Sequence, residues 1–228
     1  MHVVTVVSGG MDSVTLAEYL NFQGHQQTLV SVDYGQRHRK ELRMAELCAD
    51  RLIAPWVLLE FPHLGQLLTG SALTDPEVEV PDGHYAEESM RATVVPNRNA
   101  ILLSLAMGVA VAKGADALAI AAHAGDHFIY PDCRPGFFDA LERAFLEGNE
   151  GFAAPGFELL RPFIDKTKTD IAALGAQVGV PWDLTWSCYR GFTFHCGTCG
   201  TCVERKEAFR DSGVTDPTVY GDATTTIG

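Results

Sequence analysis

Short apolar runs alternate along most of the chain with longer stretches in which apolar residues recur at helical spacing. Strands are predicted at residues 2–8, 28–34, 56–61 and 117–122, with a weaker candidate at 157–163. Helices are predicted between them, at residues 12–23, 37–52, 97–113, 134–147 and 167–178. Near-continuous apolar strands that alternate with helices are typical of a parallel sheet covered on both faces. We therefore expect an α/β fold with a doubly wound, parallel, five-stranded sheet.

Two stretches depart from this alternation. The segment from Pro62 to Pro96 is acidic and rich in turn residues, and it has little apolar periodicity. It is equally consistent with a lid or binding loop and with a solvated surface loop. Beyond Pro181 the chain becomes rich in cysteine, and a short helix and an irregular tail are expected to follow. We expect one α/β domain at 1–180, with the loop insertion 62–96, and a small C-terminal region at 181–228.

Composition and charge favour a protein that acts on a small molecule. The 228 residues carry 17 Lys+Arg against 29 Asp+Glu, a formal net charge of −12. A surface of that sign repels phosphate backbones, and no Lys/Arg-rich run suggests a basic groove, so nucleic acid is not an expected partner. No apolar run is judged long enough to span a membrane, and no signal segment is recognised, so we expect a cytoplasmic protein without a membrane partner.

The first strand candidate leads into the sequence S-G-G-M-D-S (residues 8–13) at a predicted strand-to-helix turn. Glycines there let backbone N–H groups converge on an anion, and the start of the helix adds its positive end. Ser8 and Ser13 can donate to phosphate oxygens, whereas the Asp12 carboxylate needs a cation such as Mg²⁺ between it and a phosphate. The alternative is a tight turn with Asp12 as the helix N-cap. Neither a Walker-type loop nor a dinucleotide-binding G-x-G-x-x-G motif is present.

Four of the six cysteines lie within fifteen residues near the C-terminus: Cys188, Cys196, Cys199 and Cys202. In a reducing compartment this clustering indicates a metal site rather than disulfides. Steps of C-x-x-C with intervening glycines suit tetrahedral zinc, which we prefer to an iron–sulfur cluster or redox exchange. His195 is interpreted as a neighbour of the metal ligands rather than a ligand. Cys48, within a helical pattern, is expected to be a buried apolar residue.

S-G-G-M-D-S resembles the PP-loop, S-G-G-x-D-S, of the ATP pyrophosphatase superfamily. Those enzymes cleave ATP between its α- and β-phosphates, adenylate a substrate and release pyrophosphate. The resemblance implies a PP-loop, or adenine nucleotide α-hydrolase, type of Rossmann-like fold. It also fits the missing Walker lysine, because the leaving group is pyrophosphate.

The whole chain resembles the 7-cyano-7-deazaguanine synthase family. Besides the PP-loop and C-G-T-C-G-T-C (196–202), the resemblance includes V-D-Y-G-Q-R-H (32–38), V-P-N-R-N-A-I-L-L-S (95–104), Y-P-D-C-R (130–134), T-K-T-D-I (167–171) and G-V-P-W-D-L-T-W-S-C-Y (179–189). It implies that 7-carboxy-7-deazaguanine and ammonia are converted into a nitrile by way of an amide, with two ATP consumed, in queuosine-type biosynthesis. It further implies a structural zinc ion and a homodimer.

Candidate site residues follow from the motifs and from this resemblance. In relatives with a PP-loop the lysine that matches Lys168 faces ATP phosphates. Arg98 lies in the first turn of a predicted helix, where a cation gains nothing from the helix dipole, which hints that it faces an anion. The expected catalytic residues are Asp12, Lys168, Arg98 and Asp132. The expected ATP-binding residues are Ser8, Gly9, Gly10, Met11, Asp12, Ser13, Arg37, His38 and Lys168.

The expected deazapurine-binding residues are Asn99, Asp126, Tyr130, Asp132 and Arg134. A carboxylate matches the adjacent N–H donors of a guanine-like ring, so Asp126 or Asp132 is expected to read the base edge or to hold Mg²⁺. Cys133 could be a nucleophile, but the adenylation route does not require one. His123 and His127 lack a third ligand at a suitable spacing and are interpreted as loop residues.

Three other functions share some of these sequence features. A tRNA-modifying PP-loop enzyme fits poorly with the negative charge and the absence of a basic module. An enzyme that transfers its activated deazaguanine to an amine of a macromolecule would show similar motifs, because only the acceptor differs. A non-catalytic nucleotide- or zinc-binding module is disfavoured by the intact S-G-G-M-D-S and by Lys168.

Overall fold

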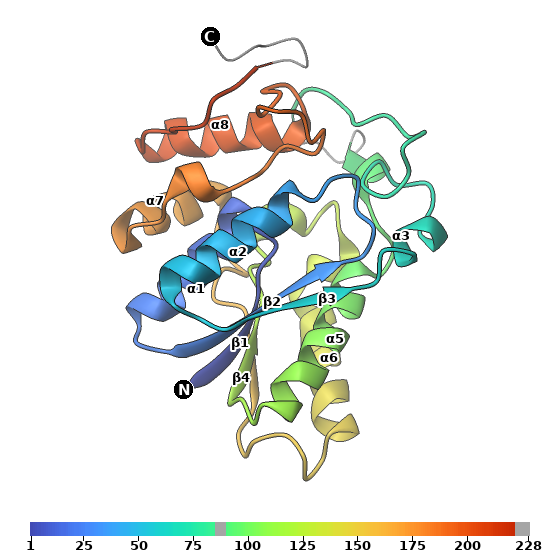
Figure 1. The fold of residues 1–228 in the computed structure, drawn as a ribbon, viewed down its shortest axis with the longest axis vertical. Coiled ribbons are helices and arrows are strands. Elements are labelled where there is room, and N and C mark those ends of the chain that lie inside the picture. The colour runs from blue at the N-terminus through green and yellow to red at the C-terminus, as the bar shows by residue number, and fades with distance from the viewer. Residues whose placement is uncertain (85–89, 222–228) are drawn as a thin grey trace.

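The computed structural model describes residues 1–84 and 90–221 (Figure 1). Five parallel strands form one sheet in the order β3-β2-β1-β4-β5. They are β1 (His2–Val6), β2 (Gln26–Asp33), β3 (Trp56–Glu60), β4 (Ala117–Ala119) and β5 (Glu158–Leu160). All five predicted strands are confirmed, including the weak fifth candidate.

The order of the strands reverses beside β1. The chain runs outward from β1 to β2 and β3, and then returns to pair β4 with the other side of β1. Val4 of β1 accordingly lies opposite both Thr28 and Leu118. In open parallel sheets such a reversal leaves a crevice at the carboxyl ends of the two central strands. A ligand is therefore expected just beyond Val6 and Ala119.

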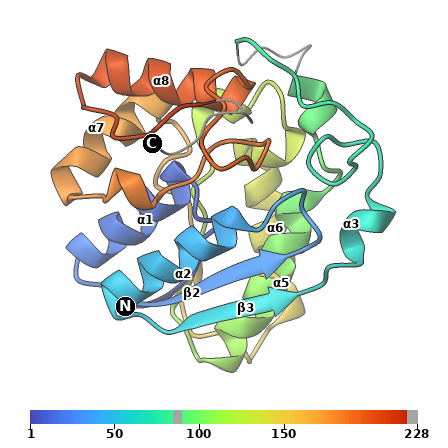
Figure 2. The ribbon, with the colours of Figure 1, turned by 45° about the horizontal axis from the view of Figure 1, so that its top comes forward.

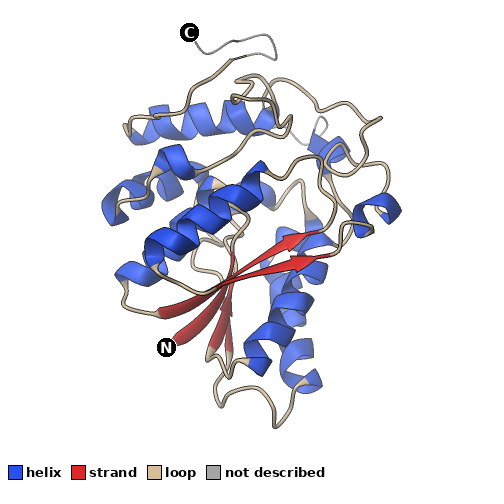
Figure 3. Ribbon diagram, in the orientation of Figure 1, coloured by secondary structure: helices blue, strands red, loops and turns tan. Residues whose placement is uncertain are grey.

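Helices cover both faces of the sheet, which confirms the doubly wound architecture (Figure 3). The helices α1 (Met11–Phe22), α2 (Lys40–Leu52), α7 (Lys168–Val178) and α8 (Gly200–Ser212) lie on one side, and α5 (Arg98–Ala112) and α6 (Pro135–Gly148) lie on the other (Figures 1 and 2). The helix expected from residue 37 begins at Lys40, because the chain first makes a turn in which Gly35 has a φ of +84°. Arg37 and His38 therefore lie in a loop.

The strand β1 shows why its sequence is apolar at almost every position. Successive strand side chains point to opposite faces. Val4 and Val6 pack on the α5 side, with Leu103 and Met107. Val3 packs on the α1 and α7 side. Burial on both faces removes the apolar–polar alternation that a half-exposed strand would show.

The described part of the 62–96 segment is anchored rather than merely solvated. It contains α3 (Leu64–Leu67) and the 3₁₀ turn η1 (Arg91–Thr93). The guanidinium of Arg37 donates to the backbone carbonyls of Pro76 and Val78, at 2.9 and 3.1 Å. Ala72 and Val80 are buried in a cluster with three of the four C-terminal cysteines.

Beyond Pro181 the chain folds back over α1 and α7. After the turn η4 (Trp182–Leu184), an irregular segment leads to α8, which lies beside α7 (Figures 1 and 2). Arg205 of α8 is fully buried, donates to Thr185 Oγ1 at 2.8 Å and pairs with Asp216 at 3.3 Å. A buried charge that is paired and hydrogen-bonded in this way joins distant parts of the C-terminal segment to one another.

One stretch, Arg91–Ala112, is long and apolar enough to cross a membrane by length and composition, contrary to the expectation that no run would be. The stretch is not one regular helix, because residues 94–97 separate η1 from α5. At about 1.5 Å per residue, the 15 residues of α5 span about 22 Å, less than the roughly 30 Å of a bilayer core. Its apolar residues Leu103, Ala106 and Met107 pack in the core against β1 and β4.

Candidate active site

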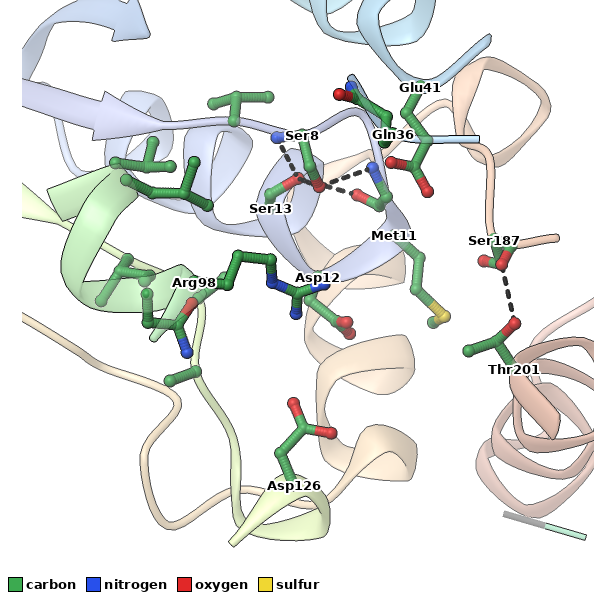
Figure 4. Close-up of a pocket in the computed structure, with 18 of the residues that line it drawn as sticks. Ser8, Met11, Asp12, Ser13, Gln36, Glu41, Arg98, Asp126, Ser187 and Thr201 are labelled. Carbon is green, nitrogen blue, oxygen red and sulfur yellow. Dashed lines mark hydrogen bonds between the residues drawn. The ribbon is translucent and has the colours of Figure 1, made fainter. Parts of the chain in front are cut away.

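A cavity of about 220 Å³ lies where the strand order reverses (Figure 4). Its walls come from the turn between β1 and α1, the loop between β2 and α2, the start of α5, the residues after β4, Lys168 of α7 and the segment 186–201. Of the residues predicted from the sequence it is lined by Ser8, Gly10, Met11, Asp12, Ser13, Arg98, Asn99, Asp126, Tyr130 and Lys168.

The turn of residues 8–13, here called the PP-loop, is held open toward the cavity by its own hydroxyls. Ser13 Oγ donates to the Gly10 carbonyl and lies 3.1 Å from Ser8 Oγ. The helix α1 starts at Met11 with Gly10 as N-cap, so the alternative in which Asp12 is the N-cap is wrong. The first N–H groups of a helix have no intrahelical acceptor. In α1 they start at the cavity wall, a suitable place for an anion.

Gly9 is required by the packing of the PP-loop on α2. It has a φ of +90°, and a Cβ atom there would lie 2.0 Å from the backbone oxygen of Glu41. The first turn of α2 therefore rests directly on the PP-loop, and this close approach excludes any side chain at position 9.

Asp12 and Lys168 form the centre of a charged cluster. Lys168 Nζ lies 2.7 Å from Asp12 Oδ2 and 3.3 Å from Glu204 Oε2. Burial by itself would raise the pKa of the Asp12 carboxyl, but Lys168 and then His123 hold that pKa below its ordinary value. Burial by itself would lower the pKa of Lys168, but Asp12 and then Glu204 raise it above its ordinary value. Both groups therefore stay charged at neutral pH.

His123 joins this cluster from the loop after β4. It is buried, and its Nδ1 accepts from Gly125 N at 3.1 Å. Its Nε2 lies 3.3 Å from Lys168 Nζ, 3.5 Å from Asp126 Oδ2 and 3.8 Å from Asp12 Oδ2. His123 thus packs against Lys168 and the two carboxylates of this cluster rather than pairing with His127 as metal ligands.

The cavity contains a carboxylate oxygen that could still bind a cation. Asp12 Oδ1 is buried and has no hydrogen-bond partner among the described residues. A buried carboxylate oxygen without a partner is costly unless a ligand completes it. With Asp126 on the same cavity wall, the oxygen donors are of the kind that Mg²⁺ prefers (Figure 4). These residues therefore fit a magnesium ion that accompanies a nucleotide.

Arg98 projects into the cavity from the first turn of α5 (Figure 4). It hydrogen-bonds Tyr34, and burial keeps the pKa of that phenol above its ordinary value, so Tyr34 is neutral. Within the described part of the chain no carboxylate forms an ion pair with Arg98. An unpaired guanidinium in a cavity suits an anionic ligand.

The structure places five other predicted residues outside the cavity lining. Asp132 Oδ2 accepts from Asn99 N at 2.9 Å and so caps the start of α5. Arg134 is exposed and donates to the His127 carbonyl. The others are Gly9, Arg37 and His38, of which the last two line a separate small pocket. Their expected roles in binding or catalysis remain predictions.

Several cavity residues were not predicted. Tyr34 and Glu41 come from the loop after β2 and the start of α2, where V-D-Y-G-Q-R-H could have drawn attention to Tyr34. Ser187, Tyr189 and Thr201 come from the cysteine-rich segment. Glu204 has no sequence signal, because only the packing of α8 on α7 brings it to Lys168.

The four cysteines converge as the spacing predicts. The Sγ atoms of Cys188, Cys196, Cys199 and Cys202 all lie within 4.8 Å of one another. Zn–S bonds of about 2.3 Å in a tetrahedron place sulfurs roughly 3.8 Å apart, and Cys196 Sγ lies 3.9 Å from Cys202 Sγ. His195 Nε2 accepts from Ser187 N at 3.0 Å, so it orients the segment rather than extending the sulfur cluster. The donor set fits a closed, four-coordinate metal site.

Two similar proteins from different organisms carry the same name. A 7-cyano-7-deazaguanine synthase of Allorhizobium ampelinum is 56% identical over 97% of this chain and 93% of its own. One from Brucella anthropi is 54% identical over 98% of this chain and 95% of its own. Among solved structures, an NH₃-dependent NAD synthetase from Campylobacter jejuni has 12% identity and a TM-score of 0.47, over 80% of this chain and 66% of that one, a likeness too weak to support an inference.

A family model described as queuosine biosynthesis protein QueC matches residues 2–213, which include the PP-loop, Lys168 and all four clustered cysteines. That match spans nearly the whole chain, and the relatives agree with it. The chain belongs to the QueC family of queuosine biosynthesis proteins.

Proposed function

We propose that this protein is a 7-cyano-7-deazaguanine synthase, a ligase that forms carbon–nitrogen bonds at the expense of ATP. It converts 7-carboxy-7-deazaguanine and ammonia into the nitrile, through an adenylated carboxylate and an amide. The observation that carries the proposal is the 56% identity to an enzyme of that name over 97% of the chain. The cavity at the PP-loop supports it with the charged groups that such a reaction needs.

The chemistry explains why ATP is required. A carboxylate resists attack by ammonia, because its charge repels the nucleophile and oxide is a poor leaving group. Adenylation removes that charge and supplies AMP as leaving group, and the amide can be activated in the same way to lose AMP. Each step depends on positioning and on neutralising phosphate charge rather than on a protein nucleophile.

The cavity supplies those groups in three places. The N-terminus of α1 and Lys168 lie on one wall and suit the β- and γ-phosphates that leave as pyrophosphate. Arg98 projects from α5 and suits the α-phosphate or the substrate carboxylate. Asp12 and Asp126 would hold Mg²⁺, which supplies charge neutralisation to the phosphates when bound.

Cys133 is not needed as a nucleophile. Its thiol is buried, and burial followed by Asp126 and Asp132 raises its pKa well above the ordinary value. The thiolate is the nucleophilic form, so such a thiol is unreactive. Of the two aspartates considered for the base edge or for Mg²⁺, only Asp126 lines the cavity, which supports its place among the Mg²⁺ ligands.

We further propose that the metal is zinc and that it is structural, because four thiolates leave no open coordination position. The dimer implied by the family resemblance and a cytoplasmic location belong to this proposal as well. The formal charge of −12 supports small molecules, and not nucleic acid, as partners.

The experiment incubates the purified protein with 7-carboxy-7-deazaguanine, ATP, Mg²⁺ and ammonium, and follows products by mass spectrometry. We expect AMP and pyrophosphate together with the amide and then the nitrile. Release of AMP without amide or nitrile would contradict ammonia as the acceptor and point to an amine on another molecule. No AMP at all would contradict the proposed function.

A further inference from the structure

A second, small pocket adjoins the main cavity. It has a volume of about 40 Å³, and five of its residues also line the cavity: Tyr34, Gln36, Glu41, Arg98 and Tyr189. Its remaining walls are Arg37, His38 and Leu73. A water-sized molecule needs about 10–15 Å³ of such space, so the pocket holds only a few atoms and is too small for a purine.

Glu41 is placed between this pocket and the PP-loop. Its backbone oxygen lies against Gly9, where a Cβ atom would approach to 2.0 Å, and its side chain reaches the cavity (Figure 4). Among the described residues its carboxyl group makes no hydrogen bond and no ion pair, and only the charge of Arg98 acts on it. A largely buried carboxyl without a partner is a candidate for contact with a ligand.

His38 presents a second acceptor without a partner. Its Nδ1 is buried and unbonded among the described residues. The hydrogen bond between His38 and the Cys188 backbone therefore involves the other ring nitrogen, Nε2. This bond raises the pKa of His38, so Nε2–H donates and the Cys188 carbonyl accepts. In the neutral ring Nδ1 then carries a lone pair, which requires an N–H or O–H donor.

The charges around the pocket favour a neutral donor over a large anion. The guanidinium of Arg37 is turned away, toward the carbonyls of Pro76 and Val78. Arg98 remains close, and its charge disfavours a second cation beside it. The lining thus suits a small molecule whose N–H groups donate hydrogen bonds and which loses its positive charge on binding.

We propose that this small pocket is the ammonia subsite and that the Glu41 carboxylate accepts a proton from the incoming ammonium ion, so that neutral ammonia attacks. The proposal rests on the proposed function. Ammonium gives one proton to Glu41, and the lone pair freed on nitrogen forms the C–N bond. The C–O bond to AMP breaks with its electron pair leaving on AMP, and the proton that the attacking nitrogen then loses goes to solvent. The first ATP supplies the leaving group, so no further reactant is needed.

The acid–base behaviour of Glu41 is consistent with this role. Burial raises the pKa of Glu41 to about 7, with Arg98 opposing the rise. A base titrating near neutral pH combines a useful ionised fraction with a useful affinity for the proton.

The test compares wild type, Glu41→Gln and the control Asp50→Asn, which removes an exposed carboxylate from the same helix. Adenylation alone is measured as exchange of labelled pyrophosphate into ATP with the acid and without ammonium. Amide formation is measured at saturating ammonium, and hydroxamate formation with hydroxylamine, which is already neutral at neutral pH. Thermal unfolding reports folding.

Glu41→Gln is expected to retain exchange and to lose ammonia-dependent amide formation by about 10²–10⁴-fold, with a much smaller loss for hydroxylamine. Asp50→Asn should match wild type throughout. Loss of exchange in Glu41→Gln, equal losses with both nucleophiles, or unchanged amide formation would each overturn the assignment while leaving the proposed function intact. Absence of exchange in the wild-type protein would overturn the proposed function, and the subsite with it.

Discussion

Two regions meet at the active-site cavity, and they are stabilised differently. The PP-loop edge is fixed by the sheet: Val6 and Val7 precede the loop, and the apolar residues of β1 are buried on both faces. The segment 186–204 has no regular structure before α8, and four thiols and a buried arginine hold it. Half of the site is thus built on a hydrophobic core and half on a segment whose four thiols could hold a metal ion.

The two regions are joined by few but direct contacts. Trp186 N donates to the Gly9 carbonyl at 2.9 Å, and Glu204 reaches Lys168 at 3.3 Å. Thr201 Oγ1 bonds the Ser187 carbonyl at 2.8 Å, which closes the cavity wall (Figure 4). We therefore expect that loss of the proposed metal would also impair the proposed reaction with ATP.

The largest loss of activity is expected from a substitution in the PP-loop, the region that the sheet holds in place. Asp12→Asn removes the negative charge that faces Lys168 and that would attract Mg²⁺, and AMP formation should fall by about 10³-fold. Circular dichroism should show an intact fold. Asp183→Asn, which changes an exposed carboxylate, is the control and should behave as wild type. Unchanged AMP release in Asp12→Asn would remove Asp12 from the phosphate site.

Removal of the proposed metal tests the second region, the cysteine-rich segment 186–204. Elemental analysis should give one zinc per chain, and Cys199→Ser or chelation should cut AMP formation by about 10²-fold, because the cavity walls from 186 to 201 lose their support. Hydrogen exchange should rise in that segment but not in β1. Cys48→Ala removes a buried thiol outside the cluster and is the matched control. Measured iron, or unchanged exchange after metal loss, would contradict this account.

Glu204→Gln probes the contact between the two regions. Lys168 keeps Asp12 at 2.7 Å but loses its second carboxylate, so we expect about a 10-fold loss in adenylation, with normal metal content. Glu207→Gln, one turn further along α8, should have no such effect. An equal loss in both variants would show that α8 matters only for folding.

The smallest effect should concern stability alone. Thr167 and Asp170 form a capping box at the start of α7. Hydrogen bonds from Thr167 hold the pKa of Asp170 below its ordinary value, so this contribution is present at neutral pH and is lost as pH falls through that lowered pKa. Asp170→Asn should cost about 0.5–1 kcal/mol at pH 7 and less in acid, as measured by urea unfolding. A constant difference down to low pH would contradict the capping role.

The same comparison explains what the sequence could predict. Apolar runs identify the strands, because burial on both faces leaves little alternation, and residues 8–13 and the C-x-x-C steps form contiguous motifs. Contacts such as Glu204 with Lys168 depend on how α8 packs on α7, which no local pattern encodes. Asp126 and Asp132 look alike in the sequence, and the turns η2 (Ala124–Asp126) and η3 (Pro131–Cys133) decide that only Asp126 lines the cavity.

The most direct test of the central claim is the yield of AMP for each deazapurine product, measured with isotopically labelled ammonium. The account predicts one AMP for the labelled amide and a second AMP for the labelled nitrile, with pyrophosphate released each time. AMP formed without label in any deazapurine, or a nitrile formed with a single AMP, would contradict it.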